Sequence, residues 1–250
     1  DPDHQREGTL PSEALKDAFS QAGESIDLAI YNFNDPVITK SLILAHKRGV
    51  NVRVVMEDEN AGKSTPFSLQ AAGIPLVAGN EDGLMHNKFA VIDGSALWMG
   101  STNFTTYGFY TDNNYFVEID DPDIARIYQD EFNEMFVSGL FGAMALEPTS
   151  RNEFSLQESK IEIYFSPEDH ISTRLIDLVE NAGESIHFLT SSFTLDDLAT
   201  AVLEKSAQGV EVKGVFDESS VSGNEGTEYD RLRRAGLDIR LDGIQGLMHE

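Results

Sequence analysis

Leu84–Thr105, with the sequence LMHNKFAVIDGSALWMGSTNFT, is the stretch from which the fold and chemistry of this 250-residue chain can be inferred. Successive side chains of a strand point to opposite faces, so His86 and Lys88 are expected on the same face. Two basic side chains then share one surface. Such a surface suits an anionic group like a phosphate ester.

The second part of this stretch predicts a returning strand. Asp93-Gly94-Ser95 is a turn signal between two apolar runs, and Gly100-Ser101 ends the second run. The hairpin should bring Ser101 and Asn103 back toward His86. An imidazole can attack phosphorus while polar groups stabilise charge on the non-bridging oxygens. The alternative for Ser101 and Asn103 is a simple turn, in which both residue types are common.

This chemistry requires a second histidine, because one imidazole cannot both attack phosphorus and protonate the leaving oxygen. Gly246-Leu247-Met248-His249 repeats Gly83-Leu84-Met85-His86 near the end of the chain. An unperturbed histidine pKa of about 6.5 allows one neutral and one protonated imidazole near neutral pH. The residues therefore predict the pair His86 and His249 and leave open which one attacks. Structural or surface histidines are the alternative interpretation.

The spacing His86-x-Lys88, four residues, Asp93, six residues, Gly100-Ser101-x-Asn103 resembles the HxKx4Dx6GSxN signature of the phospholipase D superfamily. The resemblance runs through both halves of the chain. It implies phosphodiester chemistry through a phosphohistidine, without a metal or other cofactor. The family's preference for the N-terminal copy makes His86 the expected nucleophile and His249 the general acid and base. Lys88, Ser101 and Asn103 are expected to contact the phosphate.

Five further residues are candidates for support or substrate binding. Asp93 sits at the turn and does not share the face of the histidine, so it should form the turn or support the site from behind. In many relatives an acidic residue on the following strand orients the histidine, and Asn114 occupies that position here. Tyr107, Phe109 and Tyr110 follow the Gly-Ser-x-Asn turn closely, so they either line the substrate pocket or pack in the core.

Alternating strand and helix patterns predict an α/β fold built on mixed sheets. The run that begins at Gln21 is matched by a run that begins at Asn181, and His86 is matched by His249 at nearly the same offset. We therefore predict two homologous phospholipase D-like α-β-α sandwich repeats around a pseudo-twofold axis, with one active site between them. The predicted repeats are residues 1–136 and 160–250, joined by a linker at residues 137–159.

The second predicted repeat stops at Glu250, immediately before the position where its lysine would come. We expect the missing segments to be supplied by a longer protein or by another chain, at both ends. The numbering starts without a methionine or a signal peptide. The compartment is left open, with a secreted or extracytoplasmic location slightly favoured.

Composition restricts the function further. The 18 basic and 43 acidic residues give a net charge of -25, which opposes non-specific binding to a polyanion. The absence of cysteine excludes disulfides, thiolate metal sites and a cysteine nucleophile. No apolar run approaches the roughly 20 residues of a membrane span, so no stable membrane insertion is expected. Glu57-Asp58-Glu59 lacks the spacing of a cation site and is expected to be a solvated loop, while Trp98 is expected in the core.

These features predict a phosphodiesterase that hydrolyses a phosphodiester or transfers it to another alcohol. The acidic charge narrowly favours a phospholipid headgroup ester. A metal-independent endonuclease acting on DNA or RNA is the alternative enzyme, because a basic cleft can exist on an acidic protein. The third alternative is a catalytically incomplete binding or scaffold module.

Overall fold

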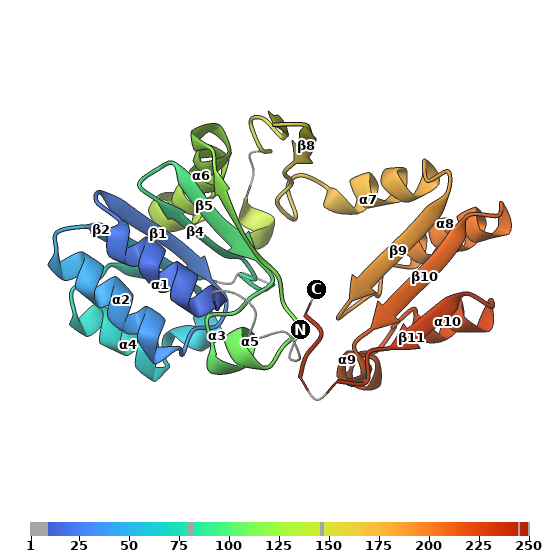
Figure 1. The fold of residues 1–250 in the computed structure, drawn as a ribbon, viewed down its shortest axis with the longest axis horizontal. Coiled ribbons are helices and arrows are strands. Elements are labelled where there is room, and N and C mark those ends of the chain that lie inside the picture. The colour runs from blue at the N-terminus through green and yellow to red at the C-terminus, as the bar shows by residue number, and fades with distance from the viewer. Residues whose placement is uncertain (1–9, 80–82, 146–147, 245, 250) are drawn as a thin grey trace. The chain divides into compact units, whose positions relative to one another are not determined.

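The computed structural model describes residues 10–79, 83–145, 148–244 and 246–249. The chain divides into two compact units. The first unit comprises residues 1–110 and 114–169, and the second comprises residues 111–113 and 170–250. Figure 1 shows that each unit contains a sheet with helices packed on it.

A six-stranded sheet with the order β3-β2-β1-β4-β5-β6 forms the centre of the first unit. The strands β1, β2 and β3 are parallel, whereas β4, β5 and β6 add antiparallel pairs. The predicted mixed sheet is therefore confirmed. The strands are β1 Ser25–Ile30, β2 Asn51–Glu57, β3 Leu76–Gly79, β4 Lys88–Ile92, β5 Ala96–Gly100 and β6 Phe116–Asp120.

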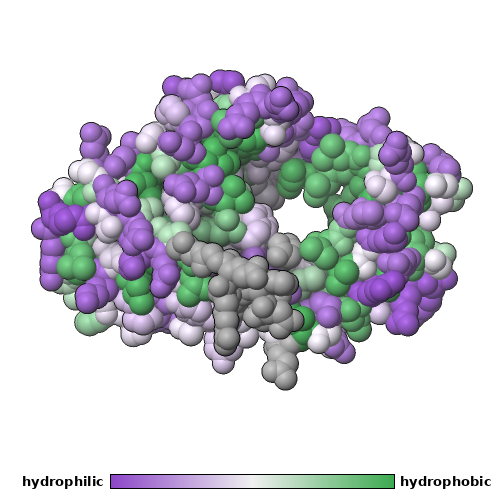
Figure 2. Space-filling view, viewed as in Figure 1, coloured by the Kyte–Doolittle hydropathy of each residue, from purple (hydrophilic) through white to green (hydrophobic). Residues whose placement is uncertain are grey.

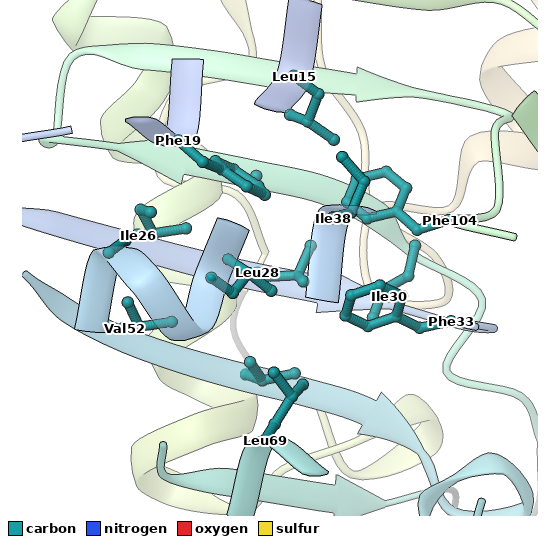
Figure 3. Packing of buried hydrophobic residues seen from close by; sticks show 14 of the residues in the cluster. Leu15, Phe19, Ile26, Leu28, Ile30, Phe33, Ile38, Val52, Leu69 and Phe104 are labelled. Carbon is teal, nitrogen blue, oxygen red and sulfur yellow. The ribbon is translucent and has the colours of Figure 1, made fainter. Parts of the chain in front are cut away.

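Helices cover one face of this sheet through an apolar core. Ile26, Leu28 and Ile30 alternate along β1 toward this face, and Figure 3 shows them beside Leu15 and Phe19 of α1. All three are completely buried, and the removal of their apolar surface from water stabilises this layer. The helices of this part of the chain are α1 Pro11–Gln21, α2 Pro36–Lys47, α3 Asp58–Ala61 and α4 Ser64–Ala71.

The helix α6, Pro122–Ser138, packs against the opposite face. Asp121 caps its first turn by accepting hydrogen bonds from two backbone N–H groups, and Gly139 ends it in the left-handed region. Beneath it, the Arg53 guanidinium binds both carboxylate oxygens of Asp27 at 2.6 and 2.8 Å and lies 5.0 Å from the Phe132 ring centroid. The buried charge of Asp27 is thus paired.

The β4–β5 hairpin is anchored at its turn. Asp93 and Gly94 both have positive φ, 50° and 63°, as a tight hairpin turn requires. The Asp93 carboxylate accepts hydrogen bonds of 2.8 to 2.9 Å from the backbone N–H groups of Gly23, Glu24 and Ser25. Burial by itself would raise the pKa of Asp93, but these three donors lower it below its ordinary value.

The second unit contains a three-stranded parallel sheet with the order β11-β10-β9. Ser25 pairs with Asn51 in the first unit, and Ser185 pairs with Glu211 in the second, so both partners are displaced by the same number of positions. The parallel half of the first sheet therefore recurs with the same register, while the pseudo-twofold packing stays a prediction. Its elements are α7 Ile171–Glu180, β9 Ser185–Thr190, α8 Asp196–Ala207, β10 Glu211–Phe216, α9 Glu218–Gly223, α10 Tyr229–Arg234 and β11 Asp238–Leu241.

The boundary between the units differs from the predicted one. The segment predicted to be a linker, residues 137–159, packs on the first unit, where Phe141 and Phe154 are buried in the core beside α6. Phe165, which was assigned to the second repeat, is buried in the same core. The aromatic side chains of this segment bury against α6, so the boundary falls after Asp169. The segment contains η1 Gly142–Met144, β7 Glu153–Leu156 and β8 Ser159–Glu162.

Hydrophilic residues lie on the surface of the first unit, and the tryptophan lies in its core. Figure 2 shows hydrophilic residues over much of the outer side of the helices of the first unit. Trp98 is buried in the core, as predicted. Among the described helices, even the 17-residue α6 lacks the length and apolar composition that crossing a bilayer requires.

Replacing Asp93 with alanine is expected to lower the free energy of unfolding by about 2–3 kcal/mol, because three backbone N–H groups lose a charged acceptor. Asp93→Asn keeps an acceptor oxygen and tolerates positive φ, so it should lose less. The folded-state pKa of Asp93 is lowered. The stability that its ionised carboxylate adds to the folded state is therefore fully present above the unfolded pKa, and it is lost as the pH falls through the folded pKa. Urea unfolding of wild type and the two variants, from above the unfolded pKa of Asp93 to below its folded pKa, measures these stability differences. If wild type were more stable than the alanine variant by the same amount at every pH, the expectation would be contradicted.

Candidate active site

His86 and Lys88 contact the same aromatic ring. The ring of Tyr31, directly after β1, meets the His86 ring edge-on, with centroids 4.7 Å apart and planes at 63°. Lys88 Nζ lies 5.2 Å from the Tyr31 ring centroid and donates a 2.8 Å hydrogen bond to the His86 carbonyl oxygen. Met85 and Phe89 are buried in the core beside α6. The predicted alternation of faces is therefore confirmed.

The two basic groups differ in their exposure to solvent. His86 is exposed, whereas Lys88 is buried. Burial lowers the pKa of Lys88 from 10.5 to about 7, because the ammonium loses solvation. A bound anion favours the charged form and would raise this pKa again. Lys88 thus loses its proton near neutral pH, and an adjacent anion would favour its charged form.

The Gly-Ser-x-Asn turn is built against the start of β6. A Cβ atom on Gly100 would lie 2.3 Å from the Tyr115 carbonyl oxygen, so the strands reach this separation only with glycine. Ser101 Oγ donates a 3.0 Å hydrogen bond to Asn114 Oδ1 and accepts one of 3.1 Å from Tyr115 N. These bonds fix the hydroxyl and leave one lone pair of Ser101 Oγ for a ligand.

The backbone after β1 joins the two parts of the motif. Tyr31 N donates a 3.1 Å hydrogen bond to Asn87 O, and Phe104 N donates one of the same length to Asn32 O. The histidine segment and the Gly-Ser-x-Asn segment are therefore held at the carboxyl end of β1, as the predicted hairpin requires. Asn103 Oδ1 is buried and has no partner among the described residues, so a donor from a substrate would satisfy it.

The three aromatic residues after this turn have different roles. Phe109 is buried and stacks on Phe104, with ring centroids 5.6 Å apart. The Tyr110 hydroxyl forms a 2.9 Å hydrogen bond with Ser12 Oγ. For these two residues the structure supports packing rather than substrate binding. Tyr107, on α5 Thr106–Tyr110, is 69% exposed and is accessible to a ligand.

Two residues near the end of β2 contact the site although the sequence did not predict them there. Glu57 is fully buried and accepts a 2.6 Å hydrogen bond from Met85 N. Asn60 is buried and donates a 2.6 Å hydrogen bond to Tyr31 O. The expectation of a solvated loop at residues 57–59 is therefore wrong for Glu57. Their position was the available signal, because ligands of open α/β sheets bind at the carboxyl ends of parallel strands.

His249 belongs to the second unit, where its segment pairs with residues 111–113. His249 N donates a 2.9 Å hydrogen bond to Asn113 O, and Asn113 N donates one to Leu247 O. Asp217, directly after β10, accepts a 3.0 Å hydrogen bond from Met248 N. Because His86 belongs to the first unit, the pairing of the two imidazoles stays a prediction.

Acidic side chains gather behind the histidine segment of the first unit. Burial raises the pKa of Glu131 to about 8, with further contributions from Glu168, Glu134 and Asp169. Glu131 and Glu168 line a cavity of about 40 Å³ together with Asn87. Glu131 therefore carries a proton at neutral pH, which limits the negative charge next to the site. Within the described ranges, no three His, Cys, Asp or Glu side chains are grouped to hold a metal ion.

Comparison with known proteins shows which family this part of the chain resembles. Residues 15–136 match the family model described as cardiolipin synthase, PLD-like domain. This part of the chain therefore resembles a phospholipase D-like domain.

Relatives in the superfamily include lipid hydrolases by name. Mitochondrial cardiolipin hydrolase from Xenopus tropicalis is 31% identical over 142 residues, which cover 56% of this chain and 64% of that protein. Phospholipase D from Rickettsia conorii is 32% identical over 116 residues, which cover 46% of this chain and 58% of that protein. The chain thus spans less than two thirds of the length of these curated relatives.

The crystal structure of phosphatidylserine synthase from Haemophilus influenzae aligns over a larger part of the chain. It covers 83% of this chain and 59% of its own, with a TM-score of 0.62 and 11% identity. At this identity the similarity shows the fold alone. It agrees with the α/β fold expected for a phospholipase D superfamily member.

Asp93 and Asn114, the two residues expected to support the site, stabilise the two turns of the motif. Asp93 forms the hairpin turn, as predicted, at the opposite end of β4 from the histidine, roughly 17 Å of strand away from Lys88. Of the two roles expected for Asp93, its hydrogen bonds to residues 23–25 support the turn-forming one. Asn114 binds Ser101 and donates a 2.9 Å hydrogen bond to Gly108 O, which stabilises the turn. Its action on His86 stays a prediction.

Gly100→Ala is expected to lower the free energy of unfolding by about 1–3 kcal/mol, because β5 and β6 must separate to admit the new methyl group. Gly62→Ala is the matched control, since nothing lies within 4 Å of a Cβ atom there. Thermal unfolding of both variants measures the effect. Equal melting temperatures for the two variants would show that the close approach at Gly100 is unimportant.

Lys88→Met is expected to remove a pH dependence of stability. The folded pKa of Lys88, about 7, lies below the unfolded value, so between these values only the unfolded state binds the proton. Wild type should therefore gain stability relative to Lys88→Met as the pH rises above 7, by up to about 1.4 kcal/mol per pH unit. Urea unfolding of both proteins at pH 7.0 to 9.5 is the measurement, and parallel stability curves would contradict the expectation.

Proposed function

We propose that this chain carries the active site of a phosphodiesterase that cleaves a phospholipid headgroup ester through a phosphohistidine on His86. The observation that supports it most is the exposed His86 imidazole against Tyr31, with the buried Lys88 in contact with the same ring. An exposed imidazole can reach a phosphorus atom, and the adjacent ammonium can neutralise charge on its oxygens. The similarity of residues 15–136 to a phospholipase D-like domain supports the same reaction class.

The proposed reaction has two steps. In the first, a ring nitrogen of His86 attacks phosphorus, and the bond from phosphorus to the leaving alcohol oxygen breaks. That oxygen takes a proton from His249, so the alcohol leaves in its neutral form. In the second step His249 removes a proton from water, whose oxygen attacks phosphorus and releases His86 and a phosphomonoester. A second alcohol in place of water would give transfer through the same intermediate.

Lys88 and the Gly-Ser-x-Asn turn stabilise the transferred group in this proposal. The Lys88 ammonium is held by the His86 carbonyl oxygen, which keeps it beside the attacking ring. Ser101 Oγ donates its proton to Asn114 Oδ1, so in this proposal the hydroxyl turns away from Asn114 to donate to a non-bridging oxygen. The buried Asn103 amide oxygen is satisfied by a donor on the substrate.

A lipid is the favoured substrate for two reasons. Cardiolipin hydrolase and phospholipase D are the names of curated relatives of this chain. The net charge of -25 also opposes long-range attraction of a polynucleotide, whose binding depends on phosphate contacts with basic residues. Cleavage of single-stranded nucleic acid is therefore the competing outcome of the test.

His86→Ala is expected to lower kcat by about 1,000-fold or more, because no other group replaces the nucleophile. His187→Ala is the matched control, since His187 is exposed and bound to Glu211 at 2.9 Å. The assays use bis-p-nitrophenyl phosphate, cardiolipin vesicles and single-stranded DNA, each in EDTA and at low and moderate salt. Unchanged turnover in His86→Ala would refute the mechanism. Faster cleavage of DNA than of lipid would refute the assignment of a lipid substrate.

A further inference from the structure

Glu57 and Asp217 occupy equivalent positions in the two units, and the reaction proposed above uses neither. Glu57 ends β2 and Asp217 directly follows β10, and the offset between them is the same one that relates the paired strands. Both side chains are buried, with 0% and 1% exposure. A carboxylate in such a position is stable only when hydrogen bonds replace its lost solvation.

Each carboxylate binds the backbone N–H group of the residue before a histidine. Glu57 Oε2 accepts from Met85 N at 2.6 Å, and Asp217 Oδ2 accepts from Met248 N at 3.0 Å. Bonds to a charged acceptor are stronger than neutral ones, and the buried setting makes the loss of either partner costly. The same hydrogen bond between a buried carboxylate and the histidine segment therefore recurs in both units, although the two acidic side chains differ in length.

The location of these bonds connects them to the imidazoles. His86 precedes β4, and His249 also lies outside the strands, so neither histidine is part of a regular ladder. Each carboxylate instead fixes the peptide group one residue earlier, and this fixes the direction in which the histidine Cβ points. A displacement of a reacting group by about 1 Å can lower a rate by on the order of 100-fold.

We infer that Glu57 and Asp217 are matched positioning residues that set the backbone of His86 and His249 for phosphoryl transfer. The inference rests on the proposed function for its chemistry and on the two hydrogen bonds for its geometry. Asp217 also accepts hydrogen bonds from Ser219 and Ser220 at the start of α9, so the experiment must separate positioning from helix capping.

The test compares Glu57→Ala with Glu57→Gln, and Asp217→Ala with Asp217→Asn, in the full 250-residue chain. The amide variants keep an acceptor oxygen, whereas alanine removes it. Glu59→Ala and Glu218→Ala are the matched controls, because they remove an exposed carboxylate close in sequence to each site. Circular dichroism at the assay temperature shows which variants are folded.

Glu57→Ala is expected to lower kcat for bis-p-nitrophenyl phosphate by about 100-fold with little change in KM, and Glu57→Gln should restore most of it. Asp217→Ala should instead give a burst of p-nitrophenolate followed by slow turnover. This leaving group departs without an acid, whereas hydrolysis of the phosphohistidine still needs the base His249. Loss of helix capping alone would not separate the burst from the later turnover.

NMR provides a readout that does not depend on activity. Glu57→Ala should accelerate amide exchange at Met85 and shift the His86 imidazole signals, and Asp217→Ala should do the same at Met248 and His249. Unchanged exchange or unmoved imidazole signals in the folded alanine variants would overturn the inference, as would equal losses of kcat in the alanine and amide variants.

If the alanine variants unfold, the amide and control variants decide: wild-type signals in the amide variants support the positioning role, and shifted ones overturn it. An inactive wild type with these NMR effects would refute the proposed function and leave the positioning role standing.

Discussion

The backbone hydrogen bonds at the carboxyl end of β1 are the constraint on which the site depends. Tyr31 N binds Asn87 O and Phe104 N binds Asn32 O, so one short segment holds both halves of the signature. β1 can do this because it lies between the parallel strand β2 and the antiparallel strand β4. Its burial from Ile26 to Ile30 fixes its position in the sheet. The segments that carry His86 and Ser101 are thus attached to a strand whose residues from Ile26 to Ile30 are all buried.

Two buried ionisable side chains of the first unit, Asp27 and Lys88, have different partners. Asp27 receives a bidentate Arg53, so this charge is compensated inside the fold. Lys88 instead meets a carbonyl oxygen and an aromatic ring, and its pKa falls from 10.5 to about 7. Keeping its ammonium charged there costs on the order of 5 kcal/mol relative to water. An adjacent phosphate would favour the charged ammonium and offset part of this cost.

The two units share a pattern of hydrogen bonds more than a pattern of burial. The strands β1–β2 and β9–β10 pair in the same register, and a carboxylate at the end of the second strand binds the histidine segment in each. In contrast, β9 has alternating exposed residues, including Leu189, whereas β1 is buried almost throughout. Backbone pairing and the positions of carboxylates are thus kept where side-chain packing has diverged.

The sequence by itself determined the hairpin, the shared face of His86 and Lys88, the mixed sheet and the core position of Trp98, because these follow from strand alternation and local turn chemistry. Spacing also identified the signature. Only the tertiary structure decided that Glu57 is buried against Met85 and that Phe109 packs in the core. It also decided that the segment from Phe141 to Phe165 belongs to the first unit. The reason is that burial depends on which distant segments meet: an acidic run looks solvated, and an aromatic segment looks like a linker, until the sheet and α6 supply their partners.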